Sequence, residues 1–163
     1  MLQKGAIIPV PPIARASGFI TFWHEKDYTV QADVMGEQVG NNMPDAGLVN
    51  QRYTLQLTGN KQELRLVSWD ALPRIDEVVK FAWKPGAWYS MKMTTVPKGG
   101  KLLVRGKVWP RGEKEPAAWT IEVEDPRPNP EGSAGIYGYA TGIFDGQAGA
   151  PAYYDNVKVT PNK

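Results

Sequence analysis

A regular alternation of side chains runs from Tyr89 to Trp109 and is interrupted only at Gly99 and Gly100. Before the two glycines, large apolar residues alternate with Ser, Lys and Thr. After them, Leu, Val, Gly and Val alternate with Leu, Arg, Lys and Trp. Successive side chains of a strand point to opposite faces, so this pattern predicts two antiparallel strands joined by a Gly-Gly hairpin turn. A long sheet with one apolar face needs a second layer to cover it, which favours two stacked sheets.

Short strand-like segments continue along the rest of the chain, separated by turns rich in Gly, Pro and Asn. Many short strands with frequent turns are typical of a sandwich or a barrel, and 163 residues fit one domain. We assign this domain to residues 18–163. Residues 1–17 contain three prolines, so we predict an irregular N-terminal segment or linker there. The predicted strands are residues 18–23, 28–34, 46–51, 53–58, 63–69, 74–80, 88–96, 101–109, 118–123, 134–140 and 152–160.

Composition excludes several classes of protein. The chain has no Cys, so it forms no disulfide and no thiolate metal site. Its net charge is only +2 and its Lys and Arg are scattered, unlike the basic surface of a nucleic-acid-binding protein. No apolar run approaches the roughly 18 residues that a membrane-spanning helix needs. The only histidine is His24, and one imidazole cannot build a multi-histidine zinc site.

Four segments carry a resemblance to a known fold family: WYSMKMTTVPKGGKLLVRGKVWPRGEKEPAAW (88–119), DYTVQADVM (27–35), GLVNQRYTLQL (47–57) and YYDNVKV (153–159). They resemble bacterial concanavalin A-like (laminin G-like) lectin and glucanase domains over about residues 18–161. The resemblance implies an all-β fold of two antiparallel sheets with jelly-roll topology. It also implies a domain often attached to larger exported proteins, such as quinoprotein-like β-propellers. We therefore expect an exported location and a partner domain in a parent protein.

The catalytic motifs of related enzymes are missing from the sequence. Glucanases of this fold resemble one another in a Glu-x-Asp-x-x-Glu strand, which the chain lacks, and it has no Gly-x-Ser-x-Gly turn. Glu122 and Glu124 share one face of a predicted strand, opposite Ile121 and Val123. Two acids opposite an apolar face are typical of a solvated surface, so no catalytic residue is assigned.

Aromatic side chains are the stronger functional signal, with six Trp and seven Tyr. Sugars stack their C–H faces on aromatic rings, while Arg and amide groups hydrogen-bond to their hydroxyls. In a curved sheet, aromatic residues that alternate with the core would line a concave groove. The predicted ligand-binding residues are Arg52, Trp69, Arg105, Trp109, Tyr137 and Tyr139. These residues can instead pack against a loop or a partner domain. Trp88 and Trp119 are expected in the core.

The resemblance also implies a structural calcium ion. Relatives of this fold often hold Ca²⁺ through an Asp of the last strand and backbone carbonyls near the N-terminus, and Asp155 matches that Asp. Calcium takes six to eight oxygen ligands, most of which carbonyls can supply. The alternative is that Asp155 hydrogen-bonds to a neighbouring strand.

Three functions stay open at this point. We favour a non-catalytic, lectin-like accessory module that binds a glycan in an aromatic groove. The alternative is a structural domain that packs on a partner domain, and the third is a sugar-active hydrolase of the same fold.

Overall fold

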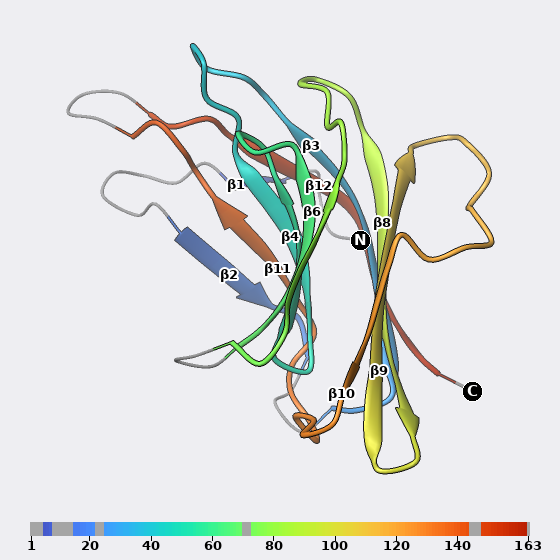
Figure 1. Cartoon of the computed structure of the whole chain (residues 1–163). Coiled ribbons are helices and arrows are strands. Elements are labelled where there is room, and N and C mark those ends of the chain that lie inside the picture. The colour runs from blue at the N-terminus through green and yellow to red at the C-terminus, as the bar shows by residue number, and fades with distance from the viewer. Residues whose placement is uncertain (1–4, 8–14, 22–24, 70–72, 144–147, 163) are drawn as a thin grey trace.

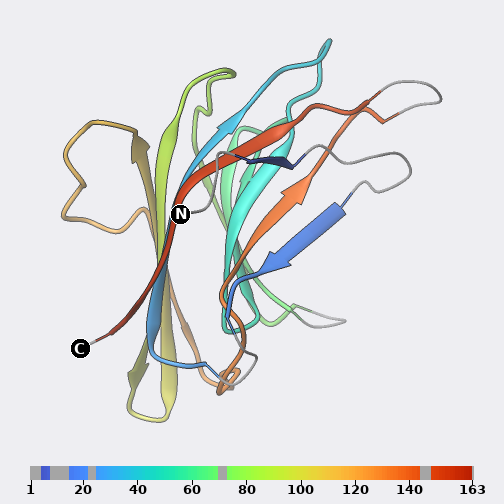
Figure 2. The same cartoon turned by 180° about the vertical axis from the view of Figure 1, so that it is seen from behind.

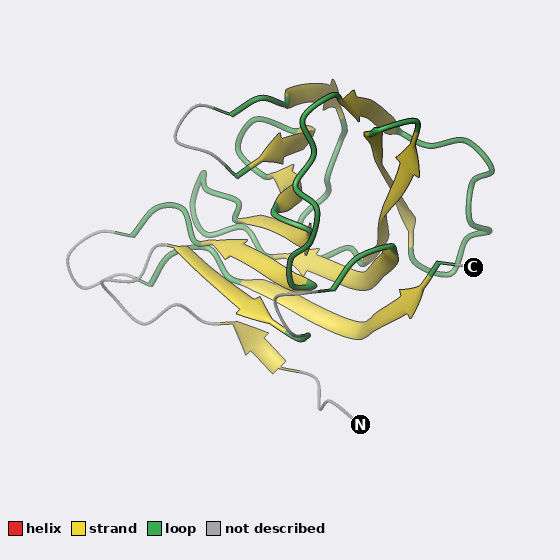
Figure 3. Ribbon diagram, turned by 90° about the horizontal axis from the view of Figure 1, so that it is seen from below, coloured by secondary structure: helices red, strands yellow, loops and turns green. Residues whose placement is uncertain are grey.

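The computed structural model of the chain describes residues 5–7, 15–21, 25–69, 73–143 and 148–162 (Figure 1). Within these residues the chain forms twelve strands and no helix. The described part therefore holds no candidate for a membrane-spanning helix. The strands make two antiparallel six-stranded sheets, which stack as two layers in the view of Figure 3. The predicted all-β sandwich with jelly-roll topology is confirmed.

Sheet A has the strand order β1-β12-β3-β8-β9-β10, and sheet B has the order β2-β11-β4-β5-β6-β7. The strands of sheet A are β1 (Gly5–Ile7), β12 (Ala152–Pro161), β3 (Tyr28–Gly36), β8 (Tyr89–Lys98), β9 (Lys101–Pro110) and β10 (Ile121–Asp125). Those of sheet B are β2 (Arg15–Phe19), β11 (Gly135–Tyr139), β4 (Asp45–Asn50), β5 (Tyr53–Thr58), β6 (Glu63–Ser68) and β7 (Asp76–Lys80). The chain therefore changes sheet before β2, β3, β4, β8, β11 and β12, which brings distant segments side by side.

The β8–β9 hairpin forms where the alternation predicts it. Lys98 pairs with Lys101 across Gly99 and Gly100, whose φ angles of 57° and 83° are left-handed. Two consecutive left-handed residues suit a tight hairpin turn, and glycine adopts them without strain. The apolar side of the hairpin faces sheet B, so Met91, Met93 and Val104 are fully buried.

The N-terminal segment differs from the expectation that residues 1–17 are irregular. β1 pairs with the outer edge of β12 (Figure 2), and β2 begins at Arg15 and pairs with β11. These strands have three and five residues, and each is the last strand of its sheet. Such short edge strands depend on their neighbour for pairing and leave almost no alternation to read. Phe22 and Trp23, at the end of the strand predicted at 18–23, lie outside the described residues.

The tryptophans divide between core and surface differently from the expectation. Trp83 is the largest fully buried side chain, although it follows a strand. Trp88 and Trp119, which were expected in the core, are only half-buried. A cationic side chain lies over each ring instead. Cζ of Arg111 is 5.1 Å from the centroid of the Trp88 ring, and Nζ of Lys107 is 4.5 Å from the centroid of the Trp119 ring.

A buried acid ties the two sheets together at one end. Asp125 of β10 accepts hydrogen bonds from the Tyr53 hydroxyl of β5 at 2.8 Å and from Arg74 at 2.9 Å. Burial alone would raise the pKa of Asp125, but the bonds from Arg74, the Arg127 amide and Tyr53 outweigh it and lower that pKa. The ionised carboxylate therefore stabilises the fold at neutral pH.

Candidate ligand-binding site

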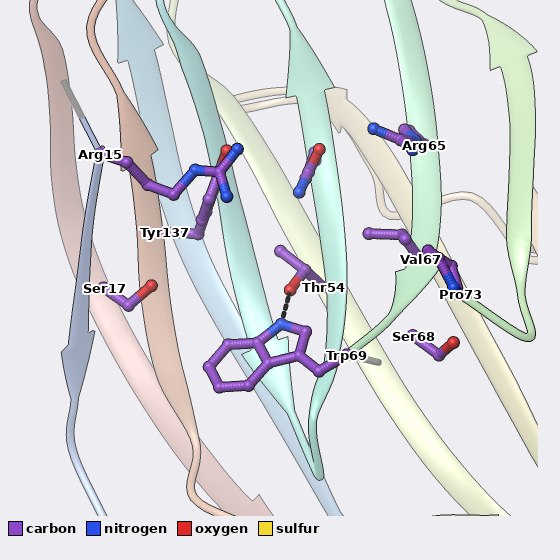
Figure 4. A pocket seen from close by; sticks show the side chains of 10 residues that line it. Arg15, Ser17, Thr54, Arg65, Val67, Ser68, Trp69, Pro73 and Tyr137 are labelled. Atoms are coloured by element: carbon purple, nitrogen blue, oxygen red, sulfur yellow. Dashed lines mark hydrogen bonds between the residues drawn. The ribbon is translucent and has the colours of Figure 1, made fainter. Parts of the chain in front are cut away.

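A hollow of about 500 Å³ lies on the outer face of sheet B, the face turned away from sheet A (Figure 4). Side chains from β2, β11, β5, β6 and the segment after β6 form its described lining, which we call the sheet B pocket. These residues are Arg15, Ser17, Thr54, Gln56, Arg65, Val67, Ser68, Trp69, Pro73 and Tyr137. The described lining thus has two arginines and no Asp or Glu, so it lacks the paired carboxylates that glycoside hydrolysis uses.

Trp69 presents an indole ring to the pocket in a fixed position. It follows the last residue of β6, and Figure 4 shows the ring reaching into the pocket with its Nε1 edge toward Thr54. Nε1 donates a hydrogen bond to the Thr54 hydroxyl of β5. The ring of Phe19 meets the indole edge-on, with centroids 5.8 Å apart. Because 39% of Trp69 remains exposed, the ring is both held and accessible.

Gln56 gives the pocket an unused hydrogen-bonding group. Its side chain extends from the outer face of β5, between the registers of Leu55 and Leu57, and is only 8% exposed. It makes no hydrogen bond to any described residue. The amide still reaches solvent in the pocket, so a ligand hydroxyl can take the place of the water that binds it.

The two arginines of the pocket have different partners. Arg65 donates from Nε and Nη2 to both oxygens of Asp76 on β7, at 2.6 and 2.7 Å, and these bonds lower the pKa of Asp76. Arg15 lies over two rings of β11, 5.9 Å from the centroid of Tyr137 and 5.8 Å from that of Tyr139. It forms no ion pair with a described carboxylate.

The backbone of Tyr137 is fixed by a hydrogen bond from a strand of sheet A. The buried hydroxyl of Tyr154 on β12 donates to the Tyr137 carbonyl and accepts a bond from the Gly47 amide at 2.7 Å. Complete burial raises the pKa of Tyr154, so its hydroxyl stays protonated and keeps both bonds. One hydroxyl of sheet A thereby fixes β11 against β4 beneath the pocket.

The structure separates the six predicted ligand-binding residues onto different surfaces. Trp69 and Tyr137 line the sheet B pocket, and Tyr139 lies on the same face under Arg15. Arg105 and Trp109 lie on the outer face of sheet A, where Trp109 is buried. A single groove holding Trp109, Arg105 and Tyr139 is therefore not formed.

The remaining sequence candidates lie elsewhere. Arg52 is exposed in the tight turn between β4 and β5, outside the described lining of the sheet B pocket. His24 lies outside the described residues.

Sequence reasoning missed the polar residues of the sheet B pocket, among them Arg15, Thr54, Gln56 and Arg65. The signal for the last three was present, since each alternates with the leucines of β5 or β6. Arg15 had no such signal, because its strand was not predicted at that position.

A second hollow, of about 670 Å³, lies on the outer face of sheet A and includes Arg105 and Trp119. Here Lys92, Arg105 and Glu115 have partners in the protein, whereas Lys158 is exposed. The guanidinium of Arg105 lies 4.7 Å from the Trp119 centroid, and Glu115 binds both Lys92 and Lys107 at 2.6 and 2.7 Å. These contacts fasten the loop after β9 to the sheet, which gives most of this surface a structural role.

The surroundings of Asp155 do not fit calcium. Its carboxylate pairs with Nη2 of Arg111 at 3.0 Å, and the same guanidinium contacts Asp33 through Nε at 3.2 Å. The Asn156 amide also donates to Asp155. A guanidinium already pairs with both carboxylates that would have to bind the cation. No group of three acidic, His or Cys side chains that could hold a metal ion occurs among the described residues.

No protein-family model matches the chain, and no curated protein matches it in sequence. Its fold is similar to those of solved structures. One is the carbohydrate-binding module CBM66 from Bacillus subtilis, with a TM-score of 0.57 and 14% identity over 88% of this chain and 76% of that one. Another is a variant of human galectin-16, with a TM-score of 0.53 and 10% identity over 95% and 99% of the two chains.

The galectin LEC-6 of Caenorhabditis elegans is also similar, with a TM-score of 0.51 and 8% identity over 93% of both chains. At these identities the likeness establishes a shared concanavalin A-like β-sandwich fold.

Proposed function

We propose that the protein is a non-catalytic, carbohydrate-binding module of the lectin-like kind and that its ligand binds in the sheet B pocket. The observation that carries this proposal is the pairing of Trp69, which is fixed and accessible, with Gln56, whose amide has no partner among the described residues. A sugar offers both complements, a C–H face for the indole and hydroxyls for the amide.

The size and chemistry of the pocket support a short glycan. Small-molecule sites have volumes of roughly 300–1,000 Å³, and the sheet B pocket has about 500 Å³. The hydroxyls of Ser17 and Thr54 lie in the same lining and add hydrogen-bonding capacity. Two of the structurally similar proteins are a carbohydrate-binding module and a galectin, which agrees with this use of the fold.

A wider role follows from the sequence resemblance. Segments such as those at 88–119 and 153–159 are typical of domains attached to larger exported bacterial proteins. We propose that this module serves such a parent protein by bringing it to a glycan.

Packing on a partner domain is a second candidate function, and exposed apolar side chains favour it. Phe19 is 55% exposed and Ile20 is 44% exposed, and Phe19 touches Trp69. Apolar side chains that gather on a surface are typical of a protein interface.

The test is a glycan-array screen of the purified protein, followed by titration of the best glycan into two variants. Trp69→Ala removes the stacking platform and should weaken binding about 10- to 30-fold, the effect of losing a central aromatic contact. Trp119→Ala is the matched control, because it removes a half-buried Trp from the opposite face and should leave the affinity unchanged.

The opposite pattern, with loss only in Trp119→Ala, would move the site to sheet A. No binding to any glycan of a broad array would favour the partner-domain function.

A further inference from the structure

The charge of the sheet B pocket does not match a neutral ligand. Its described lining contains two guanidinium groups and no carboxylate. Asp76, just outside, neutralises Arg65 through two hydrogen bonds, which leaves the charge of Arg15. Arg15, at the β2 edge, is therefore the cation of the described lining that has no carboxylate bound to it.

Arg15 has no carboxylate of its own within the described structure. The nearest acid on this face is Asp45, directly across from Tyr139 in the strand register, and it accepts a hydrogen bond from the Gly59 amide at 3.0 Å. Burial raises the pKa of Asp45, and Arg15, Arg65 and Lys61 each oppose that rise. Asp45 thus interacts with Arg15 only through space, while the guanidinium makes a side-chain hydrogen bond with Tyr137, which leaves its other N–H groups for a ligand.

Two tyrosine rings set the direction of Arg15. The guanidinium lies 5.9 and 5.8 Å from the centroids of Tyr137 and Tyr139, on the side of the rings that faces away from the core. Figure 4 shows the Arg15 side chain reaching from β2 across Tyr137 toward the pocket that also holds Trp69. The two rings and the side-chain hydrogen bond with Tyr137 restrict this long side chain and occupy only part of its five N–H donors. That edge suits a planar anion such as a carboxylate, which accepts two parallel hydrogen bonds.

We propose that the glycan bound in the sheet B pocket is acidic and that Arg15 binds its anionic group while Trp69 stacks on a sugar ring. This proposal rests on the proposed function and adds the chemical class of the ligand. Uronic acids and sulfated sugars share the required chemistry, a saccharide with a negative substituent. A carboxylate fits the planar fork of Arg15 better than a tetrahedral sulfate.

The experiment compares a carboxylated glycan with its uncharged ester and with a sulfated glycan. Oligogalacturonate, its methyl ester, and a sulfated neutral oligosaccharide of the same length are titrated into the protein by calorimetry at low and moderate salt. A charge-assisted pair is expected to make the acid bind about 10- to 100-fold more tightly than the ester. The preference should decrease at higher salt, because Arg15 is exposed.

Three variants assign the preference to its residue. Arg15→Gln should bring the ratio between acid and ester close to one, mainly by weakening the binding of the acid. Arg15→Lys keeps the positive charge but loses the paired N–H groups of the guanidinium, so it should retain only part of the preference for the acid. Lys158→Gln removes one exposed cation from the outer face of sheet A and is the charge-matched control, which should change nothing.

The outcomes separate the two proposals. Equal binding of acid and ester, lost in Trp69→Ala, would overturn the acidic preference and leave the glycan site standing. A preference that survives Arg15→Gln would also overturn this inference. Tighter binding of the sulfated probe that depends on Arg15 would support an anionic glycan and assign the anion to sulfate. Failure of every probe and of the array would overturn the glycan site itself.

Discussion

Substituting Gly106 by Ala should destabilise the protein, because the two sheets touch there. Gly106 lies on the inner side of β9, and a Cβ added to it would lie 2.5 Å from both Cδ1 and Cδ2 of Leu55 on β5. Carbon atoms in a well-packed core are about 3.5–4.0 Å apart, so Leu55 would have to move by about 1 Å. Leu55 is fully buried, and protein cores are packed too closely for such a shift to be free. Overpacking of this kind costs about 1–3 kcal/mol of unfolding free energy.

A double-mutant cycle with Leu55→Ala tests whether this contact is the cause. Leu55→Ala alone removes buried methyl groups and should cost about 2–5 kcal/mol. In that background the clash is gone, so adding Gly106→Ala should cost almost nothing. The double variant should therefore be more stable than the sum of the single effects predicts, by about 1–3 kcal/mol.

Urea unfolding of the four proteins measures the cycle, with the midpoints compared at constant slope. Additive effects, within about 0.5 kcal/mol, would refute the packing of β9 on β5. This contact matters for the site, because Leu55 lies between Thr54 and Gln56, which form part of the floor of the sheet B pocket.

Three further predictions follow from particular contacts. Asp125→Asn should lower the unfolding free energy at neutral pH by about 2–4 kcal/mol, since it breaks a buried ion pair with Arg74. Because folding lowers the pKa of Asp125, its stabilising contribution is complete above its pKa in the unfolded state, about 4, and is lost as the pH falls through its pKa in the folded state. Urea titrations at decreasing pH should therefore show that the difference in unfolding free energy between variant and parent becomes smaller. Trp119→Ala should cost only about 1–2 kcal/mol by urea unfolding, the value of its cation contacts, whereas Trp83→Ala should cost about 3–5 kcal/mol as a core truncation. Calcium should leave the melting temperature unchanged relative to chelator, because a guanidinium already neutralises Asp155, and a rise of several degrees would contradict this.

The strands of the main hairpin could be predicted because their signal is local. Each residue of β8 and β9 alternates with its chain neighbours, and the turn needs only Gly99 and Gly100. Trp119 shows where this reasoning fails. It is separated from Ile121 and Val123 by even numbers of residues, so an unbroken strand would place it on their buried face. The strand begins only at Ile121, and the preceding loop turns Trp119 onto the outer face of sheet A. Alternation therefore predicts the face of a side chain only within a continuous strand and not across an irregular segment.

The candidate site could be predicted only in part, because alternation assigns a residue to a side of its strand but not to a sheet. Arg105 and Trp109 do share one side of β9, and Tyr137 and Tyr139 share one side of β11, as the pattern predicts. β9 belongs to sheet A and β11 to sheet B, however, so the two pairs face opposite directions from the sandwich.

The residues that do meet come from strands far apart in the chain. β2 lies beside β11, so Arg15 comes to pair with Tyr139, and this neighbourhood is created by the crossovers of the jelly roll rather than by local pattern. Crossovers depend on how the whole core is covered, which no single segment encodes. Arg15 thus has the least signal in the sequence, although the proposal of an acidic ligand depends on it most.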